Sequence, residues 1–189
     1  MSLQPEVAIA LVVLVAGYIF AAVVDLTAAV VWQAWYFRTG LCVYRTIADV
    51  TSSRGIQVPT EMLNARFASR NWTSTQFHEL APGDWAVRQI GSWWLPGLIS
   101  GTMHGRLIVD PGNGKVTMLG YADWSAVWLV VVGALAIVVS RELVGLVFAG
   151  IAAIILLVSY AWRAALFSEV SQFAAYRLSV PLGEFPTRA

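Results

Sequence analysis

The sequence predicts an α+β membrane protein in which three transmembrane helices carry a small β-rich cytoplasmic domain. Of its 189 residues, 58% are hydrophobic and only 12% are charged, which is too apolar for an ordinary soluble domain. Apolar runs lie at residues 7–32, 124–139 and 143–162. The stretch between the first two runs carries strand and turn signals instead. We therefore expect one N-terminal helix, then the domain, then a C-terminal helical hairpin.

Residues 7–36 form the first predicted transmembrane helix. Residues 7–24 contain no charged residue, and the apolar run resumes after Asp25. At about 1.5 Å per residue, this run exceeds the roughly 30 Å of a bilayer's hydrocarbon core. A cleaved signal peptide is the weaker interpretation, because residues 1–6 contain no basic residue and the apolar run is longer than a usual signal core.

Residues 37–122 form the predicted central domain. One strand is predicted at residues 41–50. Two hairpins are predicted around the turn sequences at residues 81–84 and 110–114, because both contain Pro-Gly between runs typical of strands. Thr60 is placed to cap a short helix that ends at Phe67. These signals predict a small α+β domain.

Residues 123–140 and 143–163 form the second and third predicted transmembrane helices. One continuous helix over both runs would be about twice as long as a bilayer is thick, so we expect a tight turn at Ser140, Arg141 and Glu142.

The remaining residues, 164–189, are predicted to form an amphipathic juxtamembrane helix and a tail. Leu166, Val170 and Phe173 recur at helical spacing among polar residues. Pro181 is expected to end the helix, because proline cannot continue the hydrogen-bond ladder.

Arginines beside the apolar runs predict the orientation. Arg38 and Arg45 follow the first run, Arg163 and Arg177 follow the third, and Arg141 alone lies at the opposite end. Since cytoplasmic ends collect basic residues, the N-terminus is predicted outside and the central domain and C-terminus in the cytoplasm, in a membrane of the bacterial inner-membrane type. Aromatic residues gather at the same predicted interface: Trp32, Trp35, Tyr36, Tyr121, Trp124, Tyr160 and Trp162.

Asp25 is the only charged residue in the first apolar run, and it must face protein or water because facing lipid is unfavourable. Four residues at a spacing of four share its helix face and predict close packing on another helix: Gly17, Ala21, Asp25 and Ala29. A matching row lies in the third run: Gly145, Ala149 and Ala153. The first helix is therefore expected to pack on the third helix or on a helix of another protein.

Arg163 is the predicted partner of Asp25, through an ion pair or a hydrogen bond, because a long side chain at the end of the third helix can reach back. Contact of Asp25 with a partner subunit, or a role in proton or ion translocation, are the alternatives. A proton relay normally needs more than one buried ionisable group, which weakens the last of these.

The composition also excludes several functions. A net charge of +1 provides no basic field for nucleic acid. Cys42 is the single cysteine, so no disulfide can form within the chain. The two histidines, His78 and His104, lie outside the apolar runs and show no ligand spacing, so no metal or other cofactor is predicted. We find no catalytic signature.

Trp93, Trp94 and Leu98 belong to an apolar segment inside the polar domain. They are interpreted as domain core or membrane dock, or as a surface for a hydrophobic ligand or partner. The predicted function is a non-catalytic accessory or scaffold subunit of a larger membrane complex, with other membrane subunits and lipids as partners. The alternative is a membrane-anchored module that binds a lipid, a quinone or another hydrophobic ligand.

Overall fold

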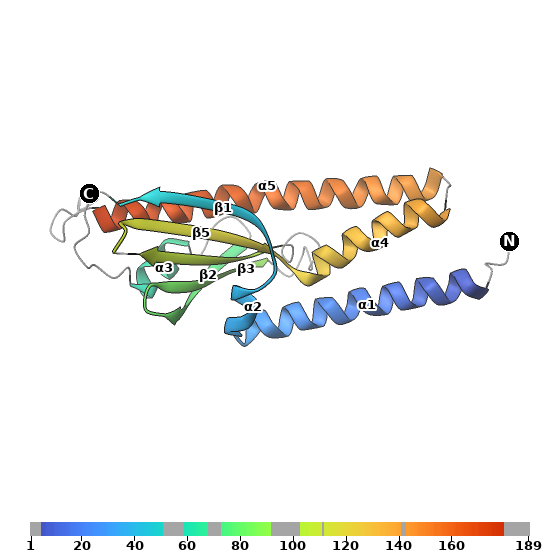
Figure 1. Cartoon of the computed structure of the whole chain (residues 1–189), viewed down its shortest axis with the longest axis horizontal. Coiled ribbons are helices and arrows are strands. Elements are labelled where there is room, and N and C mark those ends of the chain that lie inside the picture. The colour runs from blue at the N-terminus through green and yellow to red at the C-terminus, as the bar shows by residue number, and fades with distance from the viewer. Residues whose placement is uncertain are drawn as a thin grey trace.

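The computed structural model describes residues 5–50, 59–67, 73–91, 103–110, 112–140 and 143–179, and it is an α+β protein. Three long helices project from one end of an antiparallel sheet (Figure 1). The elements follow in chain order: α1 Pro5–Val30, α2 Ala34–Arg38, β1 Leu41–Asp49, α3 Thr60–Phe67, β2 Thr73–Ala81, β3 Asp84–Gly91, β4 Met103–Asp110, β5 Lys115–Ala122, α4 Trp124–Ser140 and α5 Leu143–Ser179. The predicted α+β class is confirmed.

The sheet has five strands in the order β1-β5-β4-β3-β2, and every neighbouring pair is antiparallel. Two tight turns set the hairpin registers. Gly83 and Gly114 have φ angles of +79° and +59°, a left-handed conformation that glycine adopts without strain. In the second turn, Asp110 accepts hydrogen bonds from the backbone and side-chain nitrogens of Asn113 at 3.1 and 2.6 Å. Local turn chemistry therefore determines both hairpins.

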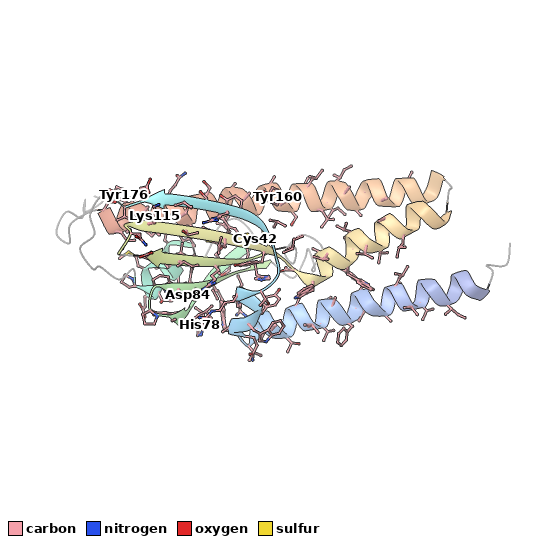
Figure 2. All side chains as sticks on the ribbon, in the orientation of Figure 1. Cys42, His78, Asp84, Lys115, Tyr160 and Tyr176 are labelled. Atoms are coloured by element: carbon pink, nitrogen blue, oxygen red, sulfur yellow. The ribbon has the colours of Figure 1, made fainter. Side chains whose placement is uncertain are left out.

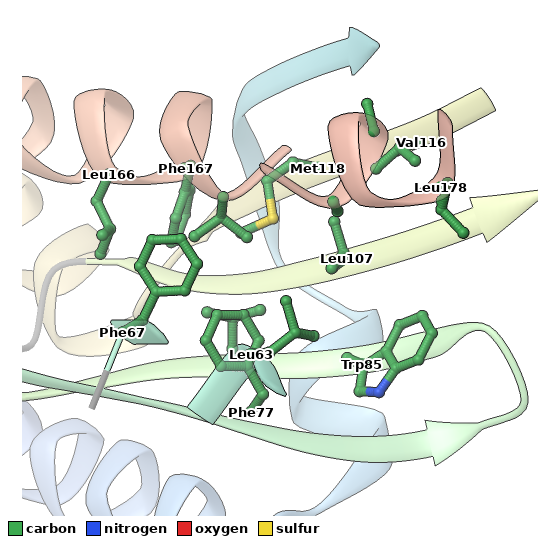
Figure 3. Packing of buried hydrophobic residues seen from close by; sticks show 14 of the residues in the cluster. Leu63, Phe67, Phe77, Trp85, Leu107, Val116, Met118, Leu166, Phe167 and Leu178 are labelled. Carbon is green, nitrogen blue, oxygen red and sulfur yellow. The ribbon is translucent and has the colours of Figure 1, made fainter. Parts of the chain in front are cut away.

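The main core lies between one face of the sheet and two helices, α3 and the C-terminal part of α5 (Figure 3). Phe167 of α5 packs over two paired glycines, Gly105 in β4 and Gly120 in β5. A Cβ atom at either glycine would lie within 3 Å of the Phe167 ring. The glycines therefore let α5 approach the sheet closely.

α5 is one continuous helix of 37 residues. The helix continues without a break through Arg163. Beyond Arg163 one of its faces is apolar, and that face covers the sheet. Leu166, Val170 and Leu178 are buried in the core on that face. The segment predicted as a juxtamembrane surface helix is thus part of the domain core.

The projecting part of the structure consists of α1, α4 and the first part of α5. α4 lies between the other two and packs against both (Figure 1). Two helical segments, Val12–Val30 and Ala149–Ser179, are long and apolar enough to cross a membrane, and the apolar part of α4, Trp124–Leu135, is shorter. Two candidate membrane helices are therefore established by length and composition.

Candidate junction site between helices and sheet

Asp25 binds the N-terminus of α4. Its carboxylate oxygens accept hydrogen bonds from the backbone amides of Trp124 at 3.1 Å and Ser125 at 2.7 Å. The first amides of a helix have no partner within the helix, and its N-terminus carries a partial positive charge. Asp25 is 7% exposed, so this bond is shielded from solvent. A residue of α1 therefore caps a helix that begins about a hundred residues later in the chain.

Asp123 immediately precedes α4, where a helix usually finds its own capping side chain. Its backbone carbonyl accepts the first helical bond, from Val127 at 3.1 Å. Its side chain turns elsewhere: Oδ1 accepts a 2.9 Å hydrogen bond from the Tyr36 hydroxyl and lies 2.6 Å from Nδ1 of His104. Because Asp25 supplies the cap, the Asp123 carboxylate is free to hold Tyr36 and His104.

Aromatic rings enclose His104. The ring of Tyr36 stacks on it at 4.0 Å between centroids, Tyr121 stacks at 5.6 Å, and Phe37 meets it edge-on at 5.5 Å. Burial, followed by the negative charges of Asp123 and Asp25, raises the pKa of Tyr36 above its usual range. The Tyr36 hydroxyl therefore stays protonated and donates a hydrogen bond to Asp123.

Arg163 joins α5 to the sheet. It is 3% exposed, and its Nη1 donates a hydrogen bond to the backbone carbonyl of Met103, the first residue of β4. The predicted bond between Arg163 and Asp25 is not formed. The physical reason is that the amides of α4 satisfy the Asp25 carboxylate, while Arg163 lies close enough to Asp123 for the two charges to interact.

Arg88 of β3 fixes the C-terminal end of α1. Its Nη1 donates a 2.6 Å hydrogen bond to the carbonyl of Ala29, and its guanidinium lies 4.1 Å from the Trp32 ring centroid. Trp32 also stacks on His78 at 5.0 Å. Cations at a helix C-terminus satisfy its free carbonyls and its negative partial charge. His78, which lies beside α2 (Figure 2), thus contributes to helix docking.

The predicted packing face of α1 does meet a helix, and that helix is α4. A Cβ atom added to Gly17 would lie 2.5 Å from the Trp128 ring, and Trp128 Nε1 donates a 2.9 Å hydrogen bond to the Leu14 carbonyl. Ala21 and Ala29 are half-buried. The prediction that the first helix could pack on the third is wrong, because α4 lies between them.

The predicted small-residue row on α5 lies apart from this junction. Ala149 is half-buried and Ala153 is exposed on α5, and Gly145 lies in the first turns of the same helix. Trp93, Trp94 and Leu98 lie outside the described residues. Cys42 is exposed at the start of β1, near Tyr160 (Figure 2).

Ion pairs around Asp84 lie on the sheet face that α2 partly covers. Asp84 accepts hydrogen bonds from Arg106 at 2.8 and 3.0 Å and from Arg38 at 3.0 Å. The pKa of Arg106 is raised mainly by its own hydrogen bonds to Asp84. Asp84 thus ties α2 to two strands.

Sequence reasoning missed Asp123, Arg88 and Trp128 as site residues, and it named Tyr36 only as a member of the aromatic belt. Only Asp123 carried a signal, because an aspartate directly before an apolar run occupies a capping position. In the part of the chain that the structure describes, no three His, Cys, Asp or Glu side chains gather to hold a metal ion. The chemistry that this junction shows is structural: charged groups joined to helix ends, carbonyls and rings.

Comparisons of the chain with models of known protein families, with curated protein sequences and with solved structures found no match.

Proposed function

We propose that this chain is a non-catalytic accessory or scaffold subunit of a larger membrane protein complex. The observation that carries the proposal is the use of two buried charged groups, Asp25 and Arg163, and one half-buried group, Arg88. Asp25 joins α1 to α4, Arg88 joins α1 to β3, and Arg163 joins α5 to β4. Each charge holds one element on another, so the helices and the sheet form a unit suited to positioning partners.

The proposed bilayer includes α4 as a third span. Asp25 caps α4, so the end of the α1 span and the start of α4 lie at one level. From Pro5 to Asp25 α1 covers about 30 Å, residues 143–162 of α5 cover about 30 Å, and α4 covers about 25 Å, at roughly 1.5 Å per residue. These lengths match a hydrocarbon core. Asp25 would then lie at the edge of the bilayer and not at its centre.

Exposed aromatic side chains support this boundary. Trp35 of α2, Trp124 at the start of α4 and Trp162 of α5 are 49%, 45% and 58% exposed. Rings of this kind favour the interface between lipid and water. The arginine distribution favours an orientation with the sheet in the cytoplasm and the N-terminus outside. The proposed membrane is of the bacterial inner-membrane type.

Partner helices would contact the outer faces of α1 and α5. Phe20 and Val23 of α1 are 72% and 56% exposed, and Ile154 and Leu157 of α5 are 62% and 67% exposed. In a membrane these faces meet either lipid or other helices. The accessory-subunit proposal requires that at least one of them meets a protein.

Site-directed photo-crosslinking tests this requirement. A photoreactive phenylalanine analogue replaces Phe20, Val23, Ile154 or Leu157, one at a time, in cells that make the protein naturally. The expected result is a discrete product of higher mass from positions on one helix. The matched control is position 166, where Leu166 is buried in the chain's own core. If all four exposed positions give only lipid adducts, the proposal is wrong.

A further inference from the structure

Two buried side chains beside Asp123 have polar atoms that bind nothing. Nε2 of His104 and both Nε and Nη2 of Arg163 have no hydrogen-bond partner among the described residues. Each of these residues is only 3% exposed, so bulk solvent does not reach them. Buried polar atoms are nearly always paired, with protein or with a bound molecule, because leaving them unpaired is unfavourable.

The unpaired atoms lie in one corner of the fold. Arg163 donates from Nη1 to the carbonyl of Met103, and His104 is the next residue of β4. Asp123 relates the two side chains: it is bonded to His104, and it is near enough to Arg163 for its charge to act on the guanidinium. The corner is formed by β4, α5 and the start of α4.

Hydrogen-bond chemistry restricts the missing partner. The carboxylate of Asp123 can only accept, so Nδ1 of His104 carries a hydrogen. Nε2 of the same ring then accepts when the ring is neutral and donates when the ring is charged. Nε and Nη2 form one edge of the Arg163 guanidinium, and both donate. An O–H group can accept from the guanidinium and pairs with either form of the His104 ring, whereas a carbonyl oxygen pairs only with the charged form.

The charges around this corner restrict the missing partner further. Asp25 and Asp123 lie close enough to repel each other, and Arg163 is the buried cation near them. An added anion would meet two carboxylates, and a metal cation would meet a guanidinium that cannot ligate it. An uncharged group fits both restrictions.

We propose that Arg163 and His104 bind a buried, uncharged O–H group in the corner between β4 and α5. Water supplies such a group, and so does the hydroxyl of a molecule dissolved in the membrane. With this group in place, a chain of hydrogen bonds runs from Tyr36 through Asp123 and His104 to Arg163.

Nuclear magnetic resonance of the full chain in lipid nanodiscs, labelled with ¹⁵N at arginine and histidine, tests the proposal. We expect the Arg163 Nε proton to exchange slowly and to show cross-relaxation with an O–H proton. We also expect His104 to carry its proton on Nδ1. His78, which is exposed, is the internal control, and its ring should show rapid exchange.

The source of the group follows from a second sample prepared after lipid extraction. Cross-relaxation to water in both samples identifies bound water. A signal at another frequency that disappears with the lipid identifies a hydroxyl ligand, and mass spectrometry of the extract then gives its mass. If the Arg163 Nε proton shows cross-relaxation with neither in a folded sample, the proposal is overturned. The measurement uses the isolated chain, so its failure leaves the accessory-subunit proposal standing.

Discussion

The carboxylate of Asp25 in α1 accepts a 2.7 Å hydrogen bond from the backbone amide of Ser125 in α4. This bond joins two helices that are separated in sequence by the whole sheet domain. It also releases Asp123, which precedes α4, to hold Tyr36 and His104. Helix docking and the buried polar cluster are therefore coupled through α4.

Replacing Asp25 by leucine removes both acceptor oxygens, whereas asparagine keeps one. Loss of a helix cap destabilises by about 0.5–2 kcal/mol. For a chain of this size, each kcal/mol lowers the melting temperature by about 2–4 °C. We expect Asp25→Leu to lower it by several degrees and Asp25→Asn by less, in thermal unfolding followed in detergent. Asp49→Asn, at an exposed acid in β1, is the control. Equal melting of Asp25→Leu and the wild type would show that the cap does not stabilise the helices.

The contact between Gly17 and Trp128 leaves no room for a methyl group. Gly17→Ala should push the Trp128 ring away and break its hydrogen bond to the Leu14 carbonyl, with a loss of about 1–3 kcal/mol for overpacking. Gly150→Ala is the matched control, because no atom lies within 4 Å of its added Cβ. In a Trp128→Leu background the Gly17→Ala change should become nearly neutral. A full loss of stability in that background would mean that another contact is responsible.

Arg88 holds the last turn of α1 through the Ala29 carbonyl and the Trp32 ring. Hydrogen bonds to charged groups contribute about 1.5–3 kcal/mol, and each 1.4 kcal/mol corresponds to about tenfold in an equilibrium. Arg88→Ala should therefore speed amide hydrogen exchange over residues 29–36 by about tenfold or more. Mass spectrometry of the peptides measures this, with Arg45→Ala, on an exposed side chain of β1, as the control. Unchanged exchange in that segment would contradict the assigned role of Arg88.

Gly105 leaves room on the sheet for the Phe167 ring. The Cβ of Gly105→Ala would lie 2.7 Å from Phe167 Cζ and 2.6 Å from Met118 Cε. We expect a loss of about 1–3 kcal/mol in the free energy of unfolding, because overpacking displaces α5. Adding Phe167→Leu should recover part of the lost stability. Gly112→Ala, in an exposed turn, should hardly change the free energy of unfolding. Denaturant unfolding measures the wild type, the single variants Gly105→Ala and Phe167→Leu, the double variant and the Gly112→Ala control. If the double variant is less stable than both single variants, the proposed steric conflict is not the cause.

Local signals in the sequence predicted most of the sheet domain. The turn at residues 110–114 and the helix at residues 60–67 depend on neighbouring residues, and the structure has a hairpin and a helix there. The Thr60 hydroxyl, predicted to cap this helix, accepts a 3.0 Å hydrogen bond from Trp85 Nε1. The burial of Asp25 was also predictable, because a lone charge in an apolar run must find a polar partner.

The partners themselves could not be predicted. Asp25 binds backbone amides, which every residue but proline carries, so no side chain marked α4 as the acceptor helix. The bond between Tyr36 and Asp123 joins residues 87 positions apart. The pattern after Arg163 showed an amphipathic helix, but it did not show that the sheet would cover its apolar face.

The central proposal is that this chain works as one subunit among others in a membrane. The most direct measurement is the mass of the intact particle, by native mass spectrometry, after mild-detergent extraction from cells that make the protein at its natural level. We expect a complex in which the 20.6 kDa chain is bound to other polypeptides in a fixed ratio. A stable particle that contains this chain alone would contradict the account.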